Sequence, residues 1–148
     1  MKILEQLITS FIATGAFGII FNAPKQSLVK CGLVGMFGWL IYVVMVDQRA
    51  DAVLATLSAT FLVAVISHIL AKAYKTPVII FSVSGVIPLV PGGLAYDAMR
   101  NFVQNDYGHA VSLAAEAFLL SGAIAFGLVF SEVLNQVIRK INQHEQVK

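Results

Sequence analysis

Charged residues divide the chain into uncharged, mostly apolar stretches at residues 6–24, 31–46, 52–71, 76–96 and 117–131. A helix needs roughly 17–25 mostly apolar residues to cross a bilayer, and long side chains at its ends can reach back to the interface. The pattern therefore predicts an all-α integral membrane protein with about five transmembrane helices, the fourth broken at a Pro/Gly motif. The expected spans cover about 3–22, 29–46, 52–71, 77–103 and 110–138.

The composition agrees with a membrane protein. The 148 residues are 58% hydrophobic and only 12% charged, whereas soluble domains carry about 25% charged residues. A water-soluble fold would have too few charges to cover its surface, so we expect a single membrane domain over 1–148. The formal net charge of +2 comes without a basic run, and we expect no nucleic acid as a partner.

The N-terminal apolar stretch could be mistaken for a secretory signal peptide. However, Glu5 lies in what would be the basic region, and no soluble mature domain follows. We therefore expect this stretch to be a membrane helix. Cys31 is the single cysteine, which leaves no internal disulfide and no cysteine-based metal cluster.

The distribution of lysine and arginine favours five spans over four, because cytoplasmic loops carry the excess of these residues. If the fourth segment re-enters and returns, the two sides carry five basic residues each. If it spans, three lie on one side, and seven lie on the other, namely Lys25, Lys30, Lys72, Lys75, Arg139, Lys140 and Lys148. The seven-to-three bias predicts five spans, an external N-terminus and a cytoplasmic C-terminus.

The stretch "GVIPLVPGGLAYDAMRNFV" at 85–103 interrupts the fourth span. Its two prolines lack amide hydrogens, and each ring clashes with the preceding helical turn. The glycine pair that follows adds backbone freedom. We therefore predict a first half-helix over 78–87, a break at 88–93 and a second helix over 94–103.

Irregular backbone at membrane depth must be buried in protein or line a wet cavity. A half-helix that begins after "PGG" directs free amides and a positive dipole end at that cavity, as in transporters that bind substrate at broken helices. A simple proline kink or an interfacial turn is the alternative interpretation. The candidate substrate-binding residues are Pro88, Pro91, Gly92, Gly93, Tyr96 and Asn101.

Ionisable residues within membrane helices are candidates for function because their burial is costly. Glu116, Asp97 and His68 are therefore possible proton or ion sites. Glu116 shares a helical face with His109 and Ser112, and that face could meet the break. The alternatives are interfacial anchoring for Glu116 and His68, and a helix-start role beside the dipole for Asp97.

Other polar and small residues have more ordinary interpretations. Glu132 is expected at the cytoplasmic interface, and Trp39 either packs or lines the cavity. Small residues recur four apart and are expected to let helices approach closely in lipid. They are Ala55 and Ala59 in the third span, and Ala123, Gly127 and Ser131 in the fifth.

The segment "VIPLVPGGLAY" at 86–96 resembles the IPxxPGxxxY signature of the threonine/serine exporter family. "FNAP" at 21–24 and a Lys-x-Pro approach to the broken helix, Lys75 and Pro77, also match. Over nearly all of its length the chain looks like the small, YjjB-like membrane subunit of that family.

The resemblance implies a multi-pass protein of the bacterial inner membrane that works with a larger membrane subunit. The pair would export a small metabolite, with threonine and serine as the linked substrates and succinate as the substrate of the split two-subunit form. The resemblance also implies contact with membrane lipid, and it is compatible with assembly into a homo-oligomer.

Enzyme motifs are absent from the sequence, which has no GxSxG, HExxH or phosphate-binding loop and no clustered metal ligands. We therefore expect neither catalysis nor a cofactor nor a metal. A pore-forming protein and a structural membrane scaffold remain as alternatives. A pore would be expected to show a polar stripe along a continuous helix, and a scaffold would not need a break.

Overall fold

The computed structural model describes residues 2–145, and these form only helices and their connections. Four helices are long and apolar enough to cross a membrane, and a bent pair makes up a fifth candidate span. The expected all-α membrane fold with a broken fourth span is therefore confirmed. The α-helices are α1 (Lys2–Ile20), α2 (Leu28–Asp47), α3 (Ala52–Tyr74), α4 (Val78–Val86), α5 (Gly92–Val103) and α6 (Tyr107–Glu145). Two short 3-10 helices are η1 (Lys25–Ser27) and η2 (Ile87–Leu89).

The same C-terminal cap closes α1, α2, α3 and α5. In each turn one residue takes a left-handed backbone conformation, and these residues are Asn22, Arg49, Lys75 and Asn105. The next amide then bonds to the carbonyl five residues earlier, as Ala23 N does to Gly18 O at 2.9 Å. This arrangement satisfies carbonyls that the helix end leaves unpaired. Because the caps are local, the sequence fixes short turns between the spans.

Helix α1 packs against α2 on a face of α2 where glycines leave room. A Cβ atom at Gly35 would overlap Thr14, and a Cβ at Gly32 would come within 2.8 Å of the Phe11 ring. Only hydrogen at these two positions lets the backbones approach this closely. The glycines of the second span therefore determine where α1 lies.

The interior of the bundle lies between α2, α3 and α4. Val34, Val63 and Val86 form one buried cluster, with one residue from each of these helices. A second cluster of Cys31, Ala71 and Phe81 again draws on all three helices. The segment before the break is therefore held inside the bundle and does not lie on its surface.

Helices α3 and α6 run parallel. Phe61 packs on Phe130 with ring centroids 5.8 Å apart, and further along both helices His68 Nδ1 lies 3.2 Å from Asn135 Nδ2. Two parallel spans require an odd number of crossings between them, so 78–103 must return the chain across the membrane. The 51° bend within this segment is too small for a reversal. The structure therefore agrees with one broken span and not with a re-entrant loop.

The small residues expected to mediate close packing do so. Ala55, Ala59, Ala123 and Ser131 are buried. A Cβ at Gly127 would stand only 3.0 Å from Leu57 O on α3. The stripe on α6 is thus the surface on which the third and the last helices meet.

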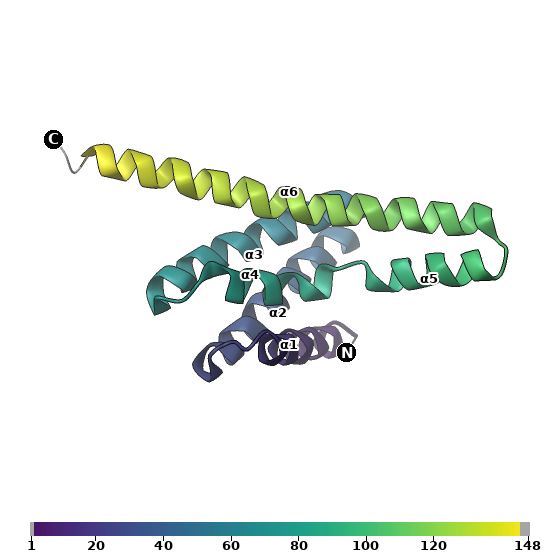
Figure 1. The fold of residues 1–148 in the computed structure, drawn as a ribbon, viewed down its shortest axis with the longest axis horizontal. Coiled ribbons are helices and arrows are strands. Elements are labelled where there is room, and N and C mark those ends of the chain that lie inside the picture. The colour runs from purple at the N-terminus through teal and green to yellow at the C-terminus, as the bar shows by residue number, and fades with distance from the viewer. Residues whose placement is uncertain (1, 146–148) are drawn as a thin grey trace.

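Helix α6 extends well beyond the bundle. It has 39 residues, which is roughly 58 Å at about 1.5 Å per residue. Figure 1 shows it running the full length of the molecule, with α5 beside its first part and α1–α4 gathered beside the remainder. Residues 92–121 therefore form a hairpin that projects past the other helices, and Phe118 on it is 79% exposed.

Candidate functional site

The break in the fourth span is shorter than the sequence predicts. Between η2 and α5 only Val90 and Pro91 lie outside a helix, so the expected irregular stretch at 88–93 is too long. The reason is that neither proline needs to donate where it stands. Pro88 occupies the first turn of η2, and Pro91 is the residue just before α5. A proline is tolerated at both kinds of position because the amide there would be unpaired anyway.

The glycine pair contributes less to the break than expected. Neither Gly92 nor Gly93 has a positive φ, and a Cβ atom at either position would meet nothing within 4 Å. Helix α5 begins at Gly92, two residues before the predicted start at Leu94. Neither a left-handed backbone conformation nor a close backbone approach requires glycine at the 51° bend.

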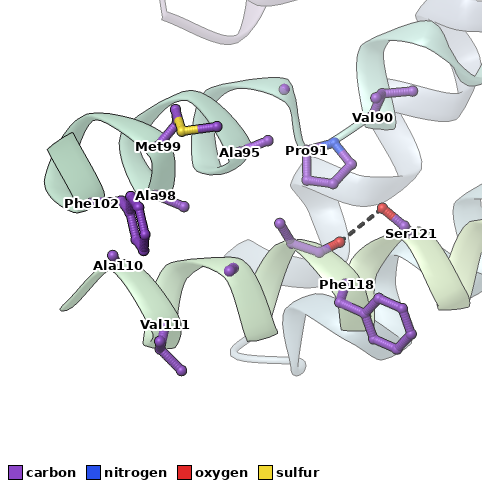
Figure 2. A pocket seen from close by; sticks show the side chains of 13 residues that line it. Val90, Pro91, Ala95, Ala98, Met99, Phe102, Ala110, Val111, Phe118 and Ser121 are labelled. Carbon is purple, nitrogen blue, oxygen red and sulfur yellow. Dashed lines mark hydrogen bonds between the residues drawn. The ribbon is translucent and has the colours of Figure 1, made fainter. Parts of the chain in front are cut away.

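One side of the break opens on an apolar groove between α5 and the first part of α6. The groove has a volume of about 600 Å³. In Figure 2, Ala98 and Phe102 of α5 lie toward the part of α6 that carries Ala110, and Pro91 stands just before α5. Its one hydroxyl, Ser121 Oγ, already donates to Ala117 O at 2.8 Å. The start of α5 thus lies beside an apolar groove. The lining comprises Val90, Pro91, Gly92, Ala95, Ala98, Met99, Phe102, Ala110, Val111, Ala114, Ala117, Phe118 and Ser121.

The other side of the break opens on a smaller and more polar hollow of about 350 Å³. Pro88 from η2 and Trp39 from α2 form part of its wall. Trp39 Nε1 is buried and has no hydrogen-bond partner. The remainder of the wall comes from α1 and consists of Glu5, Gln6, Thr9, Ser10 and Ala13. We call this space the Pro88 hollow.

The Pro88 hollow brings together an unpaired indole donor, a carboxylate, a carboxamide and two hydroxyls. Buried polar groups are normally hydrogen-bonded, so an orphaned indole N–H indicates a missing partner. The Trp39 ring packs against the Tyr42 ring, and their centroids are 5.2 Å apart. The arrangement can bind a small polar molecule with both acceptor and donor groups.

The remaining substrate candidates from the sequence lie elsewhere. Tyr96 is 67% exposed on α5. Asn101 Nδ2 donates to Asp97 O at 2.8 Å, and the Asp97 carboxylate lies 3.9 Å from Arg100 within the same helix. Neither cavity beside the break is lined by the substrate candidates Tyr96 and Asn101 or by the ion-site candidate Asp97.

Glu116 does not meet the break. It is exposed, as are His109 and Ser112 on the same face of α6. The face that packs toward α5 carries Ala110 and Ala117 instead, which are buried. The expectation that the Glu116 face meets the break was based on spacing within one helix, which cannot tell which face the neighbouring helix covers.

His68 lies far along α3 from the break and makes specific contacts with α6. Its Nε2 lies 3.1 Å from Glu132 Oε2, and its Nδ1 lies 3.2 Å from Asn135 Nδ2. Glu132 also accepts from Gln136 Nε2 at 3.1 Å. From the sequence, His68 and Glu132 are expected to be separate interfacial residues, whereas in the structure their side chains are in contact. In residues 2–145 no group of three or more metal-ligating side chains comes together.

The polar face of α1 is not among the site candidates that the sequence predicts. Gln6, Thr9, Ser10 and Ala13 recur three and four residues apart, which places them on one side of a helix. That periodicity was available in the sequence. Its relation to Pro88 was not, because it depends on how α1 packs against α2.

A sequence model of the family described as "Threonine/Serine exporter, ThrE" matches residues 6–134. An uncharacterised protein of Haemophilus influenzae is 28% identical over 143 residues, which cover 90% of this chain and 48% of that protein. The chain thus spans about half the length of this curated relative. No solved structure matches the chain.

Proposed function

Because this chain belongs to the threonine/serine exporter family, we propose that it is one subunit of a two-component exporter. The exported molecule is a small metabolite that carries a carboxylate, either threonine and serine or a dicarboxylate such as succinate. The substrate passes the break in the fourth span on its Pro88 side.

The observation that carries the proposal is that Trp39 lines the Pro88 hollow and that its buried Nε1 atom has no hydrogen-bond partner. A carboxylate oxygen is a suitable acceptor for this donor, and a hydrogen bond to a charged group is stronger than a neutral one. The Thr9 hydroxyl already donates to Glu5 O at 2.8 Å, so it can only accept from the substrate. The Gln6 carboxamide could both donate to and accept from it.

The partner is a larger membrane subunit of the same family. This proposal is supported by the length comparison, since the Haemophilus relative contains about as much chain again beyond the part that matches. The exposed apolar hairpin of residues 92–121 offers that subunit a surface within the membrane. The assembly lies in the bacterial inner membrane, with the C-terminus of this chain in the cytoplasm.

Flux measured in liposomes tests the proposal. The chain is reconstituted alone and with the co-expressed larger subunit, and the movement of labelled threonine, serine and succinate is followed. We expect flux of at least one of them only when both proteins are present. Passage of unrelated ions and sugars would instead indicate a pore, and no flux by the pair would favour a scaffold.

The variant Trp39→Phe keeps an aromatic ring but removes the N–H donor. We expect flux to fall about tenfold, because one hydrogen bond contributes about 1–1.5 kcal/mol. Tyr42→Phe is the matched control, since it changes the neighbouring ring without altering the indole donor. Equal flux from both variants would remove Trp39 from the substrate path.

A further inference from the structure

A second polar cleft lies at the C-terminal end of α3. Its walls come from the last turns of α3, the first residue of α4 and the facing part of α6. Its volume is about 270 Å³. It shares no lining residue with either cavity beside the break. The lining residues are His68, Ala71, Lys72, Thr76, Val78, Asn135, Ile138 and Arg139. We call this space the Lys72 cleft.

The charged residues of the Lys72 cleft are Lys72 and Arg139, and its lining includes no carboxylate. Within the part of the chain that the structure describes, neither cation forms an ion pair. The nearby carboxylate of Glu132 is already bonded to His68 Nε2 and Gln136 Nε2, each at 3.1 Å. Two basic residues without an ion pair, one from each helix, therefore line the same small cleft.

Thr76 provides an independent indication of a ligand. Thr76 lines this cleft, and its Oγ1 atom is buried and has no hydrogen-bond partner. Buried hydroxyls are normally paired, and an anion oxygen held by the two cations could accept from this one. His68 and Asn135 hold each other by the 3.2 Å contact, which keeps the α3 and α6 walls of the cleft together.

The cleft lies at the end of the molecule where the basic residues gather. Lys30 Nζ stands 3.2 Å from the centre of the Tyr74 ring, which brings the start of α2 to the end of α3. Since α3 and α6 run parallel, Arg139 lies at this end as well. Basic pockets between helices on the cytoplasmic side are suited to anionic groups.

We propose that the Lys72 cleft is an anion-binding site, in which Lys72, Arg139 and the Thr76 hydroxyl hold a single carboxylate or phosphate group. Two sources can supply that chemistry. One is a small carboxylate metabolite that arrives from the cytoplasm before it reaches the break. The other is the phosphate of an anionic lipid headgroup. The site does not depend on the function of the Pro88 hollow, because binding can be measured on this chain without transport.

Equilibrium binding to the purified full-length chain tests the site. The chain is placed in nanodiscs of phosphatidylcholine, and labelled succinate, threonine and inorganic phosphate are titrated. If a soluble anion is the occupant, the double variant Lys72→Gln/Arg139→Gln weakens its binding at least tenfold. The matched control, Lys75→Gln/Lys140→Gln, removes two basic residues near the same end that do not line the cleft. It should bind like the unmodified chain.

A second arm identifies a lipid occupant. Nanodiscs with phosphatidylglycerol are used, and the lipid retained after detergent exchange is measured by mass spectrometry. Retention by the unmodified chain but not by the double variant would support the site and assign it to a headgroup. Thr76→Val against Thr76→Ser serves as a subtler pair, with weaker binding expected only for valine. The proposal is overturned if neither arm separates the double variant from the unmodified chain, or if the control variant loses as much.

Discussion

The His68 ring joins α3 to α6, with its Nε2 atom 3.1 Å from Glu132 Oε2. The His68 side chain is 14% exposed, whereas that of Glu132 is 50% exposed. Because the Glu132 side chain is half exposed, the pair is expected to add little stability and mainly to align the two parallel helices.

A double-mutant cycle on His68→Ala and Glu132→Ala should give a small coupling. We expect about 0.5 kcal/mol, as for other solvent-accessible pairs. The measurement is the free energy of unfolding in detergent by a denaturant titration. A coupling of several kcal/mol would show that the pair is shielded from water in the membrane or by another subunit.

Gly35→Val should destabilise the bundle by about 1–3 kcal/mol, because a Cβ atom there would overlap Thr14 and overpacking strains the helix pair. Thermal unfolding monitored by circular dichroism measures the loss. Gly122→Ala is the control, since a Cβ atom at Gly122 meets nothing within 4 Å. Equal melting temperatures for the two variants would contradict the observed α1–α2 packing.

Pro88→Ala should reduce flux by the assembled exporter, because an alanine amide would let α4 continue as a helix and would close the Pro88 hollow. Gly92→Ala should leave flux unchanged, since no positive φ and no close neighbour requires glycine there. The two variants are compared in the liposome assay at equal reconstituted protein. If Gly92→Ala loses flux and Pro88→Ala does not, the substrate site would instead lie on the α5 side of the break.

Glu5→Gln separates the two proposed classes of substrate. The Glu5 carboxylate lies in the Pro88 hollow and can pair with the ammonium group of threonine or serine, which succinate lacks. We expect amino-acid flux to fall about tenfold through loss of a charge-assisted bond, with succinate flux unaffected. Glu116→Gln makes the same chemical change on an exposed face away from the break and should alter neither.

Single cysteines introduced in place of Lys25 and Lys140, in a Cys31→Ala background, test the orientation. Five spans with a cytoplasmic C-terminus place both positions on the cytoplasmic side. A membrane-impermeant thiol reagent should therefore label both in inverted vesicles and neither in intact cells. Labelling of the two from opposite sides would contradict the five-span arrangement.

The sequence by itself determined the class of protein and the position of the break. Apolar length decides whether a helix can span, and a proline in the interior of a helix removes a backbone hydrogen bond and interrupts it. Small residues four apart likewise marked the α3–α6 contact, because only such residues let two backbones approach. These features are local, so they can be seen without knowing how the helices pack.

Only the tertiary structure decided which side of the break is polar. Spacing along α6 placed Glu116 on a face but could not tell that Ala110 and Ala117 face α5 instead. The hollow at Pro88 exists because glycines on α2 bring α1, with Gln6 and Thr9, next to η2. Likewise, His68 and Glu132 meet because α3 and α6 run parallel. Such contacts join residues far apart in the chain, and no periodicity within one helix encodes them.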